Sequence, residues 1–183
     1  MGNVYVTSDL HLSHNKEFLY KPRGFDSPQE HNQAIVNNWN SIVTDEDIVY
    51  ILGDLIMSDS EDAMKYLKQL RGEIYFIKGN HDTANKVVLY ESLGFIGLGY
   101  AYVLKSGKWS FYLSHYPTAV GNYDDEETHK KFYCLCGHTH TTDKWKDFNQ
   151  MKSYHVELDA HNNFPISIES IKEDIRNRNE VQK

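Results

Sequence analysis

Near its amino terminus the chain reads VYVTSDLH (residues 4–11), an apolar β-type run that ends in an aspartate and a histidine. The same change from an apolar run to polar side chains recurs in IVYILGD (residues 48–54) and in IYFIKGNHD (residues 74–82). Helical patterns separate the three runs, which predicts βαβ units and a parallel sheet core. In such sheets ligands bind in the crevice outside the carboxyl ends of the strands. The polar residues that follow each run are therefore the candidate site.

The helices are predicted from their caps. A serine with a glutamate three residues later marks three helix starts: Ser27 with Glu30, Ser58 with Glu61, and Ser170 with Glu173. Pro28 suits the first position of the first helix, and Gly72 is expected to end the second.

Four further strands are predicted at residues 101–104, 109–113, 132–136 and 154–158. They follow one another closely, so we expect an antiparallel meander. The predicted fold class is α/β, with two mixed β-sheets packed as a sandwich and flanked by helices. We expect one domain over residues 1–183, with a polar tail that frays from about residue 176.

The composition excludes several classes of protein. The 183 residues carry 19 basic and 26 acidic side chains, a net charge of −7, and no Lys/Arg-rich run of the kind that marks a dedicated duplex nucleic-acid surface. No apolar stretch approaches the roughly 18 residues of a membrane span, and we expect no signal peptide. Cys134 and Cys136 lie too close together for a disulfide framework, which favours a cytoplasmic location.

Five predicted strands deliver metal-competent side chains directly past their carboxyl ends. Asp9 and His11, and again His138 and His140, are two residues apart, so both members of each pair point to one side of an extended chain. Histidine is the commonest metal ligand, and the chain contains ten. One such block alone would be weak evidence, but five in series predict side chains that meet at one centre.

These blocks resemble the calcineurin-like metallophosphoesterase superfamily, whose motifs read D-x-H, G-D-x, G-N-H-[DE], a lone H after a strand, and G-H-x-H. They stand here at residues 9–11, 53–54, 79–82, 115 and 137–140, in the family's order. The resemblance spans residue 4 to about residue 168. The form DLHLSH at residues 9–14 and the closing LDA at residues 158–160 are similar to the small, single-domain bacterial and phage branch.

The resemblance implies a centre of two divalent metal ions. It assigns one ion to Asp9, His11 and His140, the other to Asn80, His115 and His138, and a bridging position to Asp54. Nitrogen and oxygen donors without a thiolate favour Mn first, with Fe, Zn, Ni or Co also suitable, over Ca or Mg. Two carboxylates and two divalent ions leave a net charge of about +2 for a phosphate to meet.

The resemblance also implies hydrolysis of phosphomonoesters or small phosphodiesters by attack of a metal-bridging hydroxide. His81 is expected to protonate the leaving oxygen or to bind the phosphoryl group beside Asn80, and Asp82 to orient the His81 imidazole. Two more residues are candidates for substrate contact. His14 either contacts the substrate or caps its own loop, and Arg23 either binds a phosphate bidentately or is a solvated loop residue.

Two alternatives stay open: a nuclease of the same superfamily, and a metal-binding scaffold protein without turnover. The expected partner is a small phosphorylated substrate, with nucleotides among the candidates and no membrane; the oligomeric state is open. The stretch between His11 and Asp54 and the loop at residues 118–129 are expected to form the pocket rim, and Tyr116, Tyr123 or Trp145 could stack on a nucleobase. The other histidines are expected to be solvated or core residues: His31, His129, His155 and His161.

Overall fold

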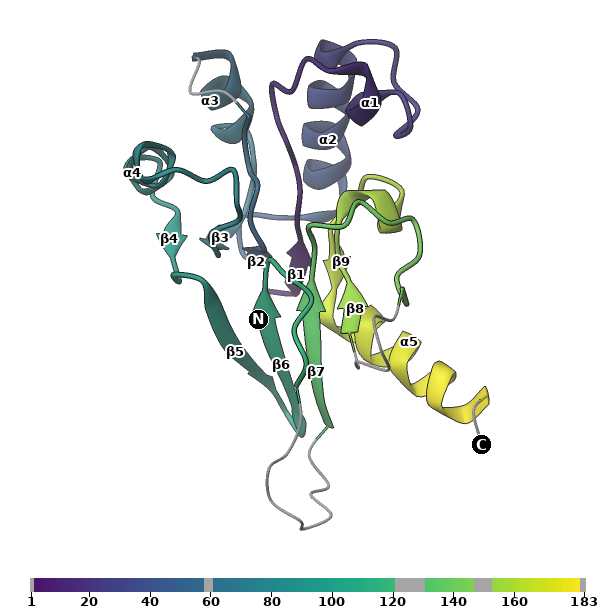
Figure 1. Ribbon diagram of the computed structural model, residues 1–183. Coiled ribbons are helices and arrows are strands. Elements are labelled where there is room, and N and C mark those ends of the chain that lie inside the picture. The colour runs from purple at the N-terminus through teal and green to yellow at the C-terminus, as the bar shows by residue number, and fades with distance from the viewer. Residues whose placement is uncertain (1, 58–60, 121–130, 147–152, 182–183) are drawn as a thin grey trace.

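The computed structural model describes residues 2–57, 61–120, 131–146 and 153–181 (Figure 1). Ser58, Tyr123, His129 and most of the expected rim at residues 118–129 lie outside the described residues. Within the described part of the chain, no helix is long and apolar enough to cross a membrane.

The first sheet has five strands in the order β4-β3-β2-β1-β9. Strands β1 (Val4–Thr7), β2 (Ile48–Ile51), β3 (Glu73–Phe76) and β4 (Ile96–Gly97) run parallel, and β9 (Ile166–Ser167) is antiparallel to β1. The predicted parallel core is therefore confirmed. The short strands β4 and β9, at the two edges of the sheet, were not predicted.

The second sheet has four strands in the order β5-β6-β7-β8: β5 (Ala101–Ser106), β6 (Trp109–Ser114), β7 (Lys131–Cys136) and β8 (Ser153–His155). Only β5 and β6 form an antiparallel hairpin, whereas β6 pairs with β7, and β7 with β8, in parallel. The predicted meander is wrong beyond that hairpin. Parallel neighbours need a crossover of about a dozen residues or more, and the long connections after β6 and β7 provide it.

The helices are α1 (Glu17–Tyr20), α2 (Pro28–Ile42), α3 (Glu61–Leu67), α4 (Ala84–Ser92) and α5 (Ile168–Val181), with a 3₁₀ turn at Leu158–His161. The predicted cap of α2 is confirmed, because Ser27 Oγ accepts a hydrogen bond from the Glu30 amide at 3.1 Å. Helix α5 starts near Ser170 as expected. It continues through Val181, so the tail predicted to fray from about residue 176 is helical that far.

The first sheet is covered on both faces, and each face belongs to a separate apolar cluster. Along β2, Val49 and Ile51 join the cluster that includes Trp39 of α2 and side chains of α3 and α4. Tyr50, between them, faces the cluster formed with the second sheet and α5. This alternation is the two-residue period of a strand buried on both faces. The predicted sandwich of two mixed sheets with flanking helices is confirmed (Figure 1).

Candidate metal centre

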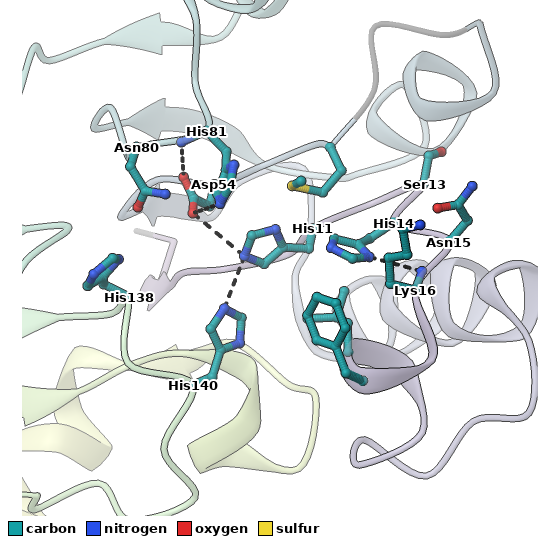
Figure 2. A pocket seen from close by; sticks show the side chains of 13 residues that line it. His11, Ser13, His14, Asn15, Lys16, Asp54, Asn80, His81, His138 and His140 are labelled. Atoms are coloured by element: carbon teal, nitrogen blue, oxygen red, sulfur yellow. Dashed lines mark hydrogen bonds and ion pairs between the residues drawn. The ribbon is translucent and has the colours of Figure 1, made fainter.

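The predicted ligands follow the carboxyl ends of strands from both sheets. Five of them line one cavity (Figure 2): His11, Asp54, Asn80, His138 and His140. The other two, Asp9 and His115, lie beside these donors. Asp9 and His11 come after β1, Asp54 after β2 and Asn80 after β3. His115 comes after β6, and the pair at 138 and 140 after β7. The parallel pairing of β6 with β7 is decisive here, because it brings both of their carboxyl ends to the same edge of the second sheet.

One group of donors is formed by Asp9, His11 and His140. The Nε2 atoms of His11 and His140 lie 3.1 Å apart, and they are 3.6 and 3.7 Å from Asp9 Oδ1. Asp9 is fully buried, and its Oδ1 atom has no hydrogen-bond partner among the described residues. A buried carboxylate oxygen without a partner is costly, and a divalent cation held by these three atoms removes that cost. The donors therefore fit a metal ion.

A second group lies beside the first, around Asp54. Asp54 Oδ2 is 3.6 Å from His11 Nε2 and also 3.6 Å from His115 Nε2, so it stands between the two groups. His115 Nε2 is in turn 2.9 Å from Asn80 Oδ1. The ring of His138 packs against that of His115 with 5.0 Å between centroids. Oxygen and nitrogen donors on two sides of one carboxylate are the arrangement that a pair of metal ions requires.

The backbone that presents these donors is strained. Asp9, His11, Asp54, His138 and His140 have φ values of 56°, 47°, 56°, 73° and 48°, in the left-handed region that costs residues other than glycine about 1–2 kcal/mol each. Glycines allow the close approach of neighbouring turns. A Cβ atom on Gly79 would collide with Asp54 Oδ1, and one on Gly137 with Asp9 Oδ2. Strain of this kind clusters at functional sites.

A family model for calcineurin-like phosphoesterases matches residues 2–180. The chain belongs to this family. Membership implies a phosphoester hydrolase that binds divalent metal ions, in agreement with the donor groups described above.

Relatives of this phosphoesterase occur in archaea and phages. It is 34% identical to an uncharacterized protein of Methanocaldococcus jannaschii over 178 residues, which cover 93% of this chain and 90% of the relative. It is 28% identical to the Gene 66 protein of Mycobacterium phage L5 over 185 residues, covering 87% and 88%.

Solved structures show the same fold. A protein of unknown function from Aquifex aeolicus superposes with a TM-score of 0.73 at 21% identity, covering 94% of this chain and 99% of that one. The phosphoesterase YfcE from E. coli superposes with a TM-score of 0.50 at 15% identity, covering 85% and 78%.

Groups behind the donors fix the ring orientation of two histidines in this phosphoesterase. His115 Nδ1 is 2.8 Å from the Leu52 carbonyl oxygen, which accepts a hydrogen bond from the Nδ1–H group. This tautomer leaves the lone pair of Nε2 available to a metal ion. His140 Nδ1 is likewise 3.1 Å from Asp159 Oδ2. Such outer partners set the tautomer of a metal-binding imidazole and are part of the site.

Arg23 is not the solvated loop residue that one of the two predictions describes. It is buried rather than solvated, and it donates to Asp159 through Nε at 3.0 Å and through NH2 at 2.7 Å. NH2 also donates to the Asp9 carbonyl oxygen at 2.8 Å. A guanidinium group has five N–H donors, and burial requires partners for them inside the protein. In the structure Arg23 therefore holds Asp159 and the backbone of Asp9, and its contact with the substrate stays a prediction.

The Asp82 carboxylate binds backbone amides of the turns around the donors. Its Oδ2 atom accepts from the amides of Asp54 at 2.7 Å and Gly79 at 2.9 Å, and its Oδ1 atom accepts from the Tyr90 hydroxyl at 2.8 Å. Both oxygens are thus engaged by groups other than the His81 imidazole. Asp82 therefore links the turns after β2 and β3, and its orientation of the His81 imidazole stays a prediction.

His81 and His14 line opposite parts of the cavity. The His81 side chain is 44% exposed and its Nε2 atom is 4.0 Å from Asp54 Oδ2, while its amide donates to Asp54 Oδ1 at 2.9 Å. His14 is buried, and its Nδ1 atom accepts from the Lys16 amide at 3.1 Å, which is the predicted loop cap. Because His14 also forms part of the cavity wall, its substrate contact stays a prediction.

The electrostatics of Asp9, His11 and His138 favour the protonation states that metal ligands need. Burial raises the pKa of the Asp9 carboxyl, but the nearby His11, His115 and His140 outweigh burial and hold the pKa below its usual range. Burial lowers the pKa of His11 and of His138. Asp9 is therefore ionised and these two imidazoles are neutral at pH 7, as coordination requires.

Sequence reasoning missed the supporting residues Asp159 and Glu157. The available signals were their position just after β8 and, for Asp159, the LDA stretch at residues 158–160 that resembles the family. Glu157 is fully buried and accepts from Thr139 Oγ1 at 2.9 Å and from the Thr141 amide at 3.3 Å, so it holds the turn that carries His140.

Four further candidates from the sequence can be placed in the structure. His31 and His155 are fully buried with polar partners, so they are core residues rather than solvated ones. The Trp145 ring packs on that of Tyr154. Tyr116 is 46% exposed and its ring is 4.7 Å from that of His138.

Proposed function

We propose that this phosphoesterase hydrolyses phosphomonoesters or small phosphodiesters at a centre of two divalent metal ions. The observation that carries the proposal is the unpartnered Asp9 Oδ1 atom facing the Nε2 atoms of His11 and His140, beside a second donor group that shares Asp54. Mn is the ion we expect first, with Fe, Zn, Ni or Co also suited to these donors. The proposed ligands are Asp9, His11, Asp54, Asn80, His115, His138 and His140.

Two divalent ions supply electrophilic activation of the phosphoryl oxygens and lower the pKa of a water toward neutrality. With Asp9 and Asp54 ionised, the charge at the donors is about −2 without the ions and about +2 with them. A phosphate group is therefore attracted to the cavity even though the whole chain carries a net charge of −7.

His81 is the residue we assign to the leaving group. Its amide is tied to Asp54 Oδ1, so the backbone of the residue is fixed while its partly exposed ring remains at the cavity wall. A protonated imidazole there donates a proton to the departing oxygen or a hydrogen bond to the phosphoryl group. Asn80, directly before His81 in the chain, lines the same cavity, and its side-chain oxygen is 2.9 Å from His115 Nε2.

The alternatives are weaker. A nuclease needs a basic surface for a long polyanion, and Lys16 is the only lysine or arginine among the described residues that line the cavity. A scaffold protein has no need to keep every donor together with His81, and all of them are present at the cavity or directly behind it.

Two variants test whether Asp54 binds the metal ions and His81 acts as the general acid. We expect Asp54→Ala to lose both metal ions, because it removes the shared carboxylate. We expect His81→Ala to retain both ions and to lose about 10²–10⁴-fold in kcat, the usual contribution of a general acid. Metal content by elemental analysis and hydrolysis of aryl mono- and diesters with Mn, Fe, Co, Ni or Zn are the measurements. Equal metal loss in the two variants would contradict the assignment, and two bound ions without turnover of any ester would favour the scaffold.

A further inference from the structure

The cavity extends well beyond the metal donors. It has a volume of about 620 Å³, inside the roughly 300–1,000 Å³ of pockets that enclose drug-sized ligands and more than a phosphoryl group alone requires. Figure 2 shows Asn80 and His138 at one end, Asn15 and Lys16 at the other, and His11 between them. Besides the donors, the cavity lining includes three apolar side chains and His14, and we call these four residues the side pocket: His14, Phe18, Leu19 and Met57.

Phe18 is the unusual residue of the side pocket. It is 75% exposed although it is a large apolar side chain, whereas its neighbours Leu19 and Tyr20 are each only 6% exposed. The two buried neighbours anchor α1 to the protein, so the exposure of Phe18 is a fixed feature of the surface and not the result of a loose segment. A ligand group that covers the ring would remove its apolar surface from water, which favours binding at this position.

The orientation of the Phe18 ring is set by His14. The two rings meet edge to face, with 5.3 Å between centroids, and His14 is itself held through its Nδ1 atom by the Lys16 amide. Phe18 therefore presents a ring whose direction is established before any ligand arrives. Met57 adds a polarizable thioether to the same cavity, and thioethers pack well against aromatic rings.

We propose that the side pocket binds the leaving group of the ester, and that this leaving group carries a planar aromatic ring that packs on Phe18. This inference rests on the proposed function, because it places the scissile phosphate at the metal donors and the remainder of the substrate beside them. An aromatic ring is favoured over an alkyl chain because the exposed Phe18 ring offers an aromatic face, on which a planar ring gains stacking energy that a flexible chain does not. Nucleosides and aryl alcohols both belong to this class.

The hydrolysis test compares each variant with the parent enzyme on the same substrate, so that the intrinsic reactivity of the leaving group cancels. We expect Phe18→Leu to lower kcat/KM about tenfold for phenyl phosphate and a nucleoside monophosphate, with little change for ethyl phosphate and glycerol phosphate. Phe18→Trp should preserve the preference. Val88→Ala, which truncates an apolar side chain that is 66% exposed on α4, is the matched control and should leave all four values unchanged.

A binding test separates this inference from the proposed function, because it needs no turnover. The metal-loaded protein should bind phenylphosphonate about tenfold more tightly than ethylphosphonate by calorimetry, and Phe18→Leu should abolish the difference. Equal affinities in the parent protein, or an unchanged preference in Phe18→Leu, would overturn the side-pocket inference. Tight, ring-selective binding without hydrolysis would instead overturn the proposed function and leave the inference standing.

Discussion

Asp159 and Arg23 connect two of the proposed ligands, Asp9 and His140. The guanidinium group of Arg23 grips both oxygens of Asp159 and the carbonyl oxygen of Asp9, and Asp159 in turn faces His140 Nδ1. Burial lowers the pKa of His140, but the Asp159 hydrogen bond and the Asp9 charge outweigh burial and raise it. The same pair of carboxylates thus makes His140 a more basic ligand, as carboxylate partners of metal-binding histidines do.

Asp159→Asn should therefore weaken one metal site more than the other. Loss of the outer carboxylate typically reduces metal affinity about 10–100-fold. We expect that loss for the ion at Asp9, His11 and His140, with the other ion nearly unaffected, in a two-site titration by calorimetry. Arg23→Lys should have the same selective effect, because a single ammonium group cannot replace the bidentate contact.

Asp174→Asn is the control for this experiment, since Asp174 forms an ion pair with Lys144 outside the cavity lining. Equal weakening of both ions, or an unchanged titration, would show that Asp159 does not position His140.

Helix α2 links the apolar core to this network through His31. His31 is fully buried on α2, and its Nε2 atom is 3.0 Å from Arg23 NH1. Burial and the neighbouring Arg23 charge lower the pKa of His31 to about 3, so the folded protein holds this imidazole neutral at any physiological pH. The helix therefore contributes an acid-sensitive group to the fold.

We predict that the metal-free protein loses stability as the pH falls from about 6.5 toward about 3. In this window the unfolded chain takes up a proton on His31 that the folded chain refuses, so the contribution is complete above the unfolded pKa and declines below it. One such group changes the free energy of unfolding by at most about 1.4 kcal/mol per pH unit. Urea denaturation at pH 7, 6 and 5 should show a shallower slope for His31→Gln. His14, whose pKa burial lowers to about 4, supplies part of the slope that remains. Identical slopes for parent and variant would refute the prediction.

The proposed centre joins the two sheets of the molecule. Asp9, Asp54 and Asn80 follow strands of the first sheet, whereas His115 and His140 follow strands of the second. Ions bound between them cross-link the two layers at one edge, in addition to the apolar cluster that packs the layers together. Metal binding is then coupled to the stability of the whole fold.

Chelation should accordingly lower the melting temperature. A ligand at 100 times its Kd stabilises a folded protein by about 2.7 kcal/mol per site, and at this chain length each kcal/mol shifts the melting temperature by about 2–4 °C. We expect a decrease of roughly 5–10 °C for each ion removed, measured by calorimetry with and without EDTA. Asp54→Ala should respond much less to added metal. A full response in that variant would place the stabilising ion elsewhere.

The three inner strands of the first sheet, β1 to β3, and the residues at their ends could be predicted because both are encoded locally. An apolar β-type run that stops at polar or glycine residues determines where a strand ends, and the side chain after it is delivered to the carboxyl edge whatever the rest of the chain does. The capping box at Ser27 is equally local, and α2 begins where that pattern places it.

Long-range choices could not be predicted in the same way. Whether β7 lies parallel or antiparallel to β6 depends on the path of the connection between them, and no local pattern specifies that path. Asp82 was expected to serve its sequence neighbour His81, but its carboxylate binds the Asp54 amide, 28 residues away. Arg23 meets Asp159 across 136 residues. In each case a buried polar group takes whichever partner the packed layers bring within reach.

The amino-acid sequence alone thus determined the fold class, the strand ends and the set of candidate donors, because these depend on short-range periodicity and on residue chemistry. The three-dimensional arrangement determined that Asp82 and Asp159 support the donors, whereas Asp9 and Asp54 are themselves donors. It also determined that Phe18 borders the cavity. Those outcomes depend on contacts between distant segments, which form only when the two sheets pack and bury their polar groups together.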